Sequence, residues 1–553
     1  MKRHWALLLG LATAAAASVA TSADILQHEP RHSPFAYILD YLTRHPGQPE
    51  CFINEGYLNF REDWQVDTAM PRAAIQGTNY LRRWSYPTGG SKGSPDVTRT
   101  LLQGLAKVPG LSTNIFVAVA AADCDGCGAS RPYLRQVLPE AQLHTDLVAD
   151  TTHGKTVQCT NGTVYLTQNG SVNLQTVGVT TKANTSLVFV ETGQGNQVPP
   201  MYGHFRNLWH AVVSGSGSVF PGGGGDSSGL DGMSHPAMIG GRPVTFYAGR
   251  RNAFVGPTWT DGGLSIPFPG NLFPPTAGEL PAGDLRTVNW YDQVILDAGT
   301  QLVDGQAVTI DIYMFEIGQS NPFIDNLVRL VEHGFVDCPP EGCAGSRARN
   351  APDGGKVVAI SKRPGARVPA NAFPGQLTVN LNYQFQDPCT SRRPCPETAT
   401  IRYLGRPIVG GNPAYRMNVN RVWQGFRQSR LPGNPRVPST PQDMHLKLAL
   451  LTHGQQVRLY VATSNLDTPN VGSGQKWQAG NTIDMNVTDG LYRQYLPELH
   501  SIATEGDLSQ FLLSQANIAG NSYFDPAIAP AGGAITASGI AAYLFPLATN
   551  AMP

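Results

Sequence analysis

Two stretches of the chain carry the same four reactive residue types at the same spacing. In each, a His is followed by a Lys after two positions, a hydroxyl residue after 18 and an Asn after 20. The two sets are His153, Lys155, Ser171 and Asn173, and His445, Lys447, Thr463 and Asn465. With 13 His in 553 residues, random placement gives about 0.2 instances of His-x-Lys. The doubled set therefore indicates one functional site built from two copies.

The two sets contain the groups that phosphodiester cleavage needs. Two ammonium groups and two side-chain amides can hold a charged phosphoryl group without a metal. One imidazole can attack phosphorus to give a phosphohistidine, while the other protonates the departing oxygen and then activates water or an alcohol. The candidate catalytic residues are His153, Lys155, Asn173, His445, Lys447 and Asn465, supported by Ser171 and Thr463. No metal or other cofactor is expected.

Two β-hairpins are predicted to position these side chains. Residues i and i+2 of a strand share one face, so the His and Lys of each pair project together, as do the hydroxyl residue and the Asn. Asn161-Gly162 is a strong turn dipeptide between strand-like stretches 156–158 and 163–167. A second turn near His453-Gly454 separates 448–451 from 457–461. Each hairpin would present its four reactive side chains at one end.

Helices are predicted before and after each hairpin. Ser94-Pro95 and Asn321-Pro322 each place a cap residue before a Pro and open an apolar pattern of helical period. The helix starts are 227 residues apart whereas the two His are 292 apart, which predicts an insertion of about 65 residues near 354–442. After the hairpins, the 201–205 pattern returns at 491–495, and Asn184-Thr185 returns as Asn481-Thr482.

At these residues the chain resembles the phospholipase D superfamily, whose duplicated motif is His-x-Lys followed by Gly-Ser-x-Asn. The motifs stand here as HGK with NGSVNL and as HLK with ATSNLD. The resemblance implies an α/β fold of two pseudo-two-fold-related α/β/α sandwich halves with mixed sheets, meeting at a central site. By position, it implies that His153 is the nucleophile and His445 the general acid. The resemblance extends from about residue 80 to 502.

The chain departs from the common superfamily pattern in two ways. The Asp usually found seven positions after each His is replaced by Thr160 and Thr452, and the His-to-Asn distance is about three residues longer. Both features, and the Thr-Ser-Asn-Leu string at 463–466, are similar to the tyrosyl-DNA phosphodiesterase branch. No acidic partner of either His is evident from the motifs, and Glu191 and Glu316 are candidates because each ends a strand-like stretch.

The expected organisation has four parts. Residues 1–23 have the charged start, apolar stretch and small residues of a signal peptide, which predicts a secreted or periplasmic protein. A first half covers 24–214, a Gly- and Pro-rich linker with loops covers 215–285, and a second half covers 286–553. The eight cysteines include three close pairs, 124/127, 338/343 and 389/395, and an even count in an exported chain predicts disulfide bonds.

Composition limits the partners. Lys plus Arg and Asp plus Glu both number 40, and removal of 1–23 leaves a net charge of about −2, so no overall basic character favours nucleic acid. The first functional hypothesis is an exported, monomeric phospholipase D-like enzyme that releases phospholipid headgroups, transfers the phosphatidyl group to alcohols and contacts membrane surfaces transiently. An exported nuclease with the same site is the alternative. An inactive scaffold that binds a ligand is a third hypothesis of another class.

Overall fold

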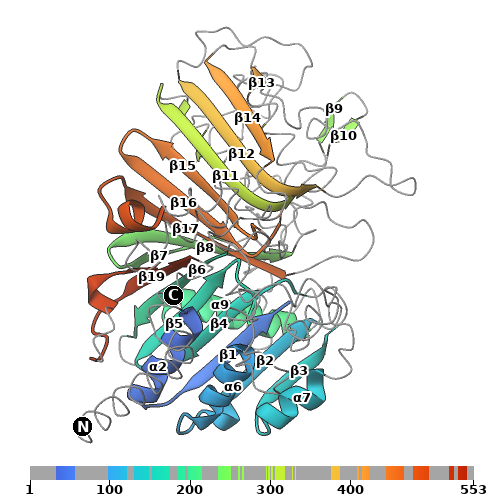
Figure 1. Ribbon diagram of the computed structural model, residues 1–553, viewed down its shortest axis with the longest axis vertical. Coiled ribbons are helices and arrows are strands. Elements are labelled where there is room, and N and C mark those ends of the chain that lie inside the picture. The colour runs from blue at the N-terminus through green and yellow to red at the C-terminus, as the bar shows by residue number, and fades with distance from the viewer. Residues whose placement is uncertain are drawn as a thin grey trace, which may run out of the picture.

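Two mixed β-sheets dominate the described part of the chain. The computed structural model describes residues 33–56, 97–120, 130–147, 152–174, 184–193, 197–214, 234–250, 259–261, 264–266, 305–317, 375–386, 408–409, 414–421, 444–465, 477–496, 522–528 and 533–544, with a few helical residues between 294 and 331. The sheets have eight and nine strands, and a separate pair joins β9 (Trp259–Asp261) to β10 (Leu264–Ile266). The predicted α/β fold with two mixed sheets is confirmed (Figure 1).

The first sheet has the strand order β18-β19-β6-β5-β4-β1-β2-β3. Strands β1, β2 and β3 run parallel, and the others pair antiparallel with their neighbours. The bounds are β1 (Glu50–Glu55), β2 (Ile115–Ala120), β3 (Gln142–Leu147), β4 (Lys155–Thr160), β5 (Val164–Gly170), β6 (Thr185–Thr192), β18 (Ser522–Phe524) and β19 (Gly539–Leu544).

The second sheet repeats this plan with the order β13-β14-β12-β11-β15-β16-β17-β8-β7. Strands β11, β12 and β14 are parallel, like β1, β2 and β3, and β15, β16 and β17 follow antiparallel, like β4, β5 and β6. The bounds are β7 (Ser234–Ile239), β8 (Arg242–Arg250), β11 (Ala307–Ile317), β12 (Gln376–Gln386), β13 (Ile408–Val409), β14 (Tyr415–Arg421), β15 (Lys447–His453), β16 (Gln456–Ala462) and β17 (Trp477–Asn486).

The two halves exchange hairpins across the predicted boundaries. The β7-β8 hairpin lies in the expected linker 215–285, yet β8 pairs with β17 of the second sheet. The β18-β19 hairpin lies in the expected second half, yet β19 pairs with β6 of the first sheet. Each sheet is therefore completed by a hairpin that follows the other half in sequence, and both hairpins lie between the halves (Figure 1).

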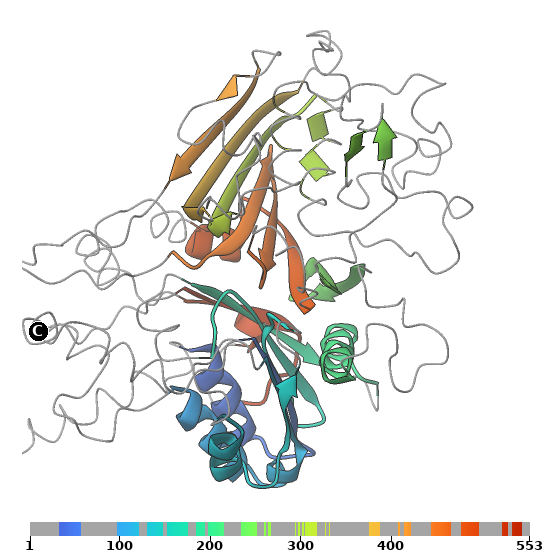
Figure 2. The ribbon, with the colours of Figure 1, turned by 90° about the vertical axis from the view of Figure 1, so that its right-hand side faces the viewer.

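Helices cover the outer face of the first sheet. Helices α2 (Pro34–Arg44), α6 (Val97–Lys107) and α7 (Ser130–Val137) pack there, and the hydroxyl of Ser33 caps α2 by accepting from two of its first backbone N–H groups. On the other face, α9 (Pro200–Ser214) packs toward the second half (Figure 2). Along β1 the side chains alternate: Cys51 and Ile53 face the outer helices and Phe52 faces α9.

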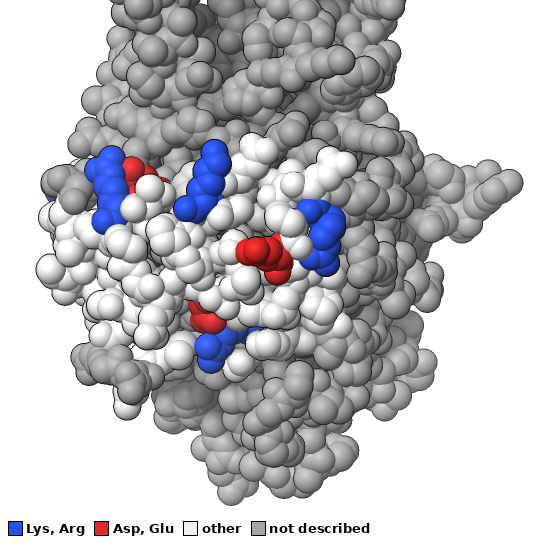
Figure 3. Space-filling view, turned by 90° about the horizontal axis from the view of Figure 1, so that it is seen from below, with Lys and Arg blue, Asp and Glu red and all other residues white. Residues whose placement is uncertain are grey.

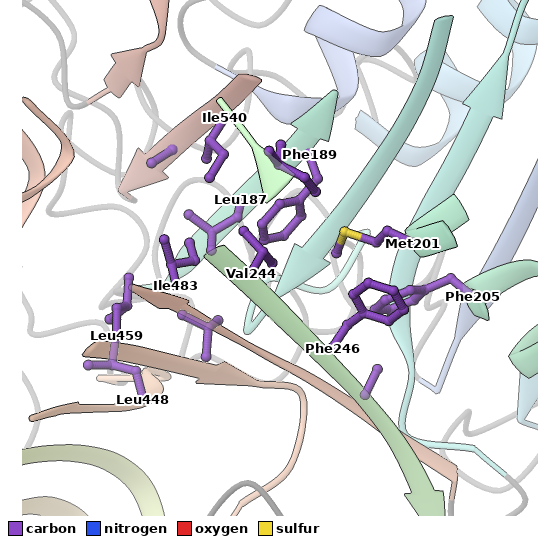
Figure 4. Close-up of a cluster of buried hydrophobic side chains, with 14 of the residues drawn as sticks. Leu187, Phe189, Met201, Phe205, Val244, Phe246, Leu448, Leu459, Ile483 and Ile540 are labelled. Carbon is purple, nitrogen blue, oxygen red and sulfur yellow. The ribbon is translucent and has the colours of Figure 1, made fainter. Parts of the chain in front are cut away.

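One apolar core spans both halves. It joins side chains of β6, α9 and β19 to side chains of β8, β15, β16 and β17, as Figure 4 shows. The residues labelled there are Leu187, Phe189, Met201, Phe205, Val244, Phe246, Leu448, Leu459, Ile483 and Ile540. Because this core is shared, the two sheets are held in a fixed relation, which is what a site built from both requires.

The predicted hairpins are confirmed at both motifs. Strands β4 and β5 turn at Gly162, with φ of 89°, and β15 and β16 turn at Gly454, with φ of 57°. Asn161 supports the first turn by accepting hydrogen bonds from the backbone of Thr163 and Val164. The stretch 354–442, expected to be an insertion, contains β12, β13 and β14 of the second sheet, so it is not wholly an insertion.

Several predictions from the sequence fall outside the described residues. These are the signal peptide, the two Pro-containing helix starts and the three close cysteine pairs. The remaining two cysteines, Cys51 and Cys159, form a disulfide between the directly paired strands β1 and β4. Within the described ranges, no helix is both long and apolar enough to cross a membrane. Seen from below, the described surface carries scattered charges of both signs (Figure 3).

Candidate active site

The first His-Lys pair lies at the start of β4. His153 and Lys155 are 7% and 0% exposed, so both reactive groups are held inside the protein. The loop that carries them is fixed from β1, because Asn54 accepts a hydrogen bond from the hydroxyl of Thr152, which in turn accepts from the backbone N–H of Gly154. The ammonium of Lys155 donates to Nε2 of His153 at 3.1 Å and to its carbonyl at 3.3 Å.

The second pair takes the equivalent place at the start of β15. His445 is 6% exposed, Lys447 is fully buried, and Lys447 donates to the carbonyl of His445 at 3.2 Å. The ring of Phe315 on β11 lies beside both side chains, with its centroid 5.1 Å from the Lys447 ammonium and 4.8 Å from the His445 ring. The aromatic face stabilises the buried cation.

Each imidazole is oriented by an amide from the opposite half. Oδ1 of Asn184, at the start of β6, lies 2.7 Å from Nδ1 of His445. The hydroxyl of Ser171 donates to the same oxygen at 3.1 Å, and it also accepts from the backbone N–H of Thr185. Ser171 therefore acts through Asn184: it holds the amide that holds the histidine of the other copy.

The reciprocal arrangement holds the first histidine. Oε1 of Gln478, on β17, lies 3.2 Å from Nδ1 of His153. The hydroxyl of Thr463 donates to this oxygen at 3.0 Å and accepts from the backbone N–H of Ala479. Hydroxyl, amide and histidine thus form two crossed chains, Ser171–Asn184–His445 and Thr463–Gln478–His153, which tie each motif to the other.

These bonds determine the protonation of the rings. An amide oxygen can only accept, so Nδ1 of each histidine carries a proton and donates it. An ammonium can only donate, so Nε2 of His153 is an acceptor with a lone pair. His153 is therefore a neutral imidazole whose Nε2 has the form required of a nucleophile.

The two motif asparagines complete the set. Asn173 is 5% exposed, and Nδ2 of Asn465 donates to the carboxylate of Glu316 at 3.1 Å. The Oδ1 atoms of both asparagines are buried and accept no hydrogen bond among the described residues. All eight predicted site residues are thus described, and the crossed chains link the histidine and the hydroxyl residue of one copy to those of the other.

Two residues suggested from the sequence have other positions. Asn481, expected to be the counterpart of Asn184, instead accepts a hydrogen bond from Asn169 at 3.0 Å, and Gln478 takes the equivalent place. Glu191 accepts from the backbone of Met201 and Tyr202 at the start of α9, so it does not orient a histidine. Asn184 follows Ser171 by 13 residues and Gln478 follows Thr463 by 15. This spacing is nearly equal in the two copies, but both residues are amides, whereas the sequence was expected to supply acidic partners.

Glu55 is a site neighbour that the motifs do not indicate. It ends β1 directly opposite Lys155 and is fully buried. Burial raises the pKa of Glu55 well above its ordinary value, against the opposing influence of the Lys155 ammonium and the backbone of Leu174. Gly56, the next residue, passes so close to the loop that a Cβ there would lie 2.9 Å from Cα of His153.

Comparison with known proteins finds distant structural likenesses. No protein-family model matches the chain, and no curated protein matches it. A polyphosphate kinase from Porphyromonas gingivalis matches 84% of this chain at 8% identity with a TM-score of 0.36, and the chain covers 48% of that kinase. A yeast tyrosyl-DNA phosphodiesterase mutant matches 80% of this chain and 84% of its own length, at 10% identity and a TM-score of 0.31. Another structure of the yeast enzyme matches 68% of this chain and 79% of its own length, at 10% identity and a TM-score of 0.27.

Proposed function

We propose that this chain is a phospholipase D-like phosphodiesterase that works through a phosphohistidine and needs no metal. The observation that carries the proposal is the pair of crossed chains, which hold two buried histidines with Nδ1 protonated beside two buried lysines. A His and a Lys that merely lay on the surface of a strand would need neither burial nor an amide acceptor from the opposite half. Burial of two ammonium groups is costly, and a phosphoryl anion bound against them would offset part of that cost.

The proposed reaction has two steps. Nε2 of His153 forms a bond to phosphorus as the bond to the leaving oxygen breaks, and a protonated His445 gives its Nε2 proton to that oxygen. His445 then takes a proton from water, whose oxygen forms a bond to phosphorus as the N–P bond breaks. Lys155 and Lys447, with the amides of Asn173 and Asn465, stabilise the charge on the phosphoryl oxygens. An alcohol in place of water would give transfer of the group.

For the substrate, the proposal is a phospholipid headgroup. It is supported by the near-neutral overall charge, because a protein that binds nucleic acid is expected to be basic. The proposal includes export, a monomeric state and transient contact with a membrane surface. A nuclease is the alternative, favoured by the Thr-Ser-Asn-Leu string at 463–466, and a binding scaffold without activity is the remaining one.

The test is cleavage in EDTA of phosphatidylcholine vesicles and of single-stranded DNA. His153→Ala and His445→Ala are compared with His453→Ala, which removes a half-buried histidine at the far end of β15. Headgroup release that is lost in the first two variants and kept in the third supports the proposal. DNA degradation with the same pattern supports the nuclease, and inactivity on both substrates contradicts the phospholipase proposal and favours the scaffold.

A further inference from the structure

Glu55 is a buried carboxyl group next to the candidate site that the proposed reaction does not use. It lies opposite Lys155 in the β1–β4 register, and paired residues of antiparallel strands project on the same face. Glu55 and Lys155 are both fully buried. No described side chain donates a hydrogen bond to either carboxyl oxygen of Glu55.

The groups around Glu55 are few and distinct. On the side of β1 away from β4, Glu55 pairs with the apolar Val119 of β2. The backbone of Leu174, in the segment after β5, also lies near the Glu55 carboxyl group. Among the described residues, the charged group that acts on Glu55 is Lys155, and His153 is a titratable group two positions before that lysine. Glu55 therefore responds first to what happens at the Lys155 ammonium.

The second half has a different residue at the equivalent register position. Met314 on β11 pairs with Lys447 as Glu55 pairs with Lys155. A thioether cannot exchange a proton, so the position opposite the lysine is titratable in one half alone. The carboxyl group of Glu316 lies two residues beyond Met314 and accepts from Asn465, which is a separate contact.

Oxyanion binding places a second negative charge against Lys155. Two anions that share one cation inside a protein repel each other, and the one that can take a proton becomes neutral. An oxyanion of a phosphodiester keeps its charge throughout the neutral pH range, whereas the Glu55 carboxylate loses the stabilising influence of Lys155 when that anion binds, so its pKa rises further. The proton thus goes to Glu55.

We propose that Glu55 takes up a proton from solvent when an oxyanion binds against Lys155 and returns it when the anion leaves. This inference rests on the proposed function, because it requires the two lysines to form an anion site. The proton joins a carboxylate oxygen, and no other bond changes. By linkage, anion affinity falls as pH rises through the titration of Glu55, so product departs more readily at higher pH.

Sulfate is a suitable probe because it stays a dianion throughout the pH range and is not turned over. Its binding is measured by calorimetry in buffers of different ionisation enthalpy, which gives the protons taken up, and its affinity is measured against pH. We expect an affinity that falls by up to about tenfold per pH unit in the wild type. In Glu55→Gln we expect less proton uptake and a flatter pH dependence. The histidines contribute to both proteins, so the difference isolates Glu55.

Met314→Leu is the matched control, since it changes the equivalent position without removing a titratable group. It should keep the wild-type proton uptake. If Glu55→Gln does not fold, Glu55→Met, which copies the second half, tests the same point. Equal proton uptake in wild type and the Glu55 variant would overturn the inference while leaving the anion site intact. Failure of every protein to bind sulfate would instead count against the proposed function itself, and this inference would fall with it.

Discussion

Nδ1 of His445 donates to Oδ1 of Asn184 across the boundary between the halves, at 2.7 Å. The partner of each candidate catalytic histidine is thus a neutral amide and not a carboxylate, because Gln478 takes the same role for His153. A neutral acceptor fixes the tautomer and stabilises the imidazolium less than a carboxylate does. The balance between nucleophile and acid is therefore set by residues outside both motifs.

Asn184→Asp and Gln478→Glu should each move the pH dependence of the reaction. A carboxylate in either place favours the charged imidazole. We therefore expect Gln478→Glu to move the acid limb of kcat/KM, which His153 sets, and Asn184→Asp to move the alkaline limb, which His445 sets, each to higher pH by about one unit or more. Asn184→Ala, which removes the acceptor, should lower kcat by about 100-fold or more because the ring loses its orientation. Profiles of both acidic variants that superimpose on the wild type would contradict this role.

Gly154→Ala should damage activity more than stability. A Cβ at this position would lie 2.6 Å from Nδ2 of Asn54, which holds Thr152 and thereby the loop bearing His153. Gly454→Ala is the control: its φ of 57° disfavours a side chain, at a cost of about 1 kcal/mol, but nothing lies within 4 Å. Steady-state kinetics and thermal denaturation on both variants separate the two effects. Wild-type kinetics in Gly154→Ala would show that the close approach does not position His153.

Arg242→Met should unfold the protein at a lower temperature. The guanidinium on β8 donates to Asp489 through two nitrogens at 2.8 Å and to Asp525 at 2.8 and 2.9 Å. Removal leaves both carboxylates without this cationic partner in a largely buried place, and we expect a loss of about 3–5 kcal/mol in the free energy of unfolding. Arg44→Ala breaks a surface pair with Asp40 and should cost less than about 0.5 kcal/mol. Equal losses in chemical denaturation would refute the importance of the Arg242 cluster.

Glu191→Gln should change how stability depends on pH. Burial raises the pKa of Glu191 from 4.5 to about 7, with the backbone N–H groups of Tyr202 and Met201 acting the other way. The folded state thus holds a proton that the unfolded state releases, so the contribution of Glu191 is fully present below about pH 4.5 and is lost as pH rises through about 7. The loss is of the order of 3 kcal/mol. The free energy of unfolding of the variant should fall less over this range, and an unchanged slope would contradict the assignment.

The local patterns of the sequence predict the two hairpins that carry the candidate site residues. A period of two places His153 with Lys155, and Asn161-Gly162 makes a turn whatever surrounds it, because both effects depend on neighbours in sequence. Gln478 was not predicted because the segment from Thr463 to Gln478 is two residues longer than the segment from Ser171 to Asn184, so equal spacing does not align the two amides. Glu55 and the exchanged hairpins depend on pairing between distant segments, which no local pattern encodes.

The exchanged hairpins also link the folding of this chain to its synthesis. The backbone N–H of Thr192, at the end of β6, donates to the hydroxyl of Ser538, 346 residues later, and β19 closes beside it. While the ribosome is still adding the second half, the first sheet has an open edge at β6, and such an edge invites pairing with other chains. The nascent first half would therefore depend on a chaperone or on rapid synthesis. Conversely, two polypeptides produced by a cut after β8 would each contain strands that the other needs, a natural design for a split-protein complementation reporter.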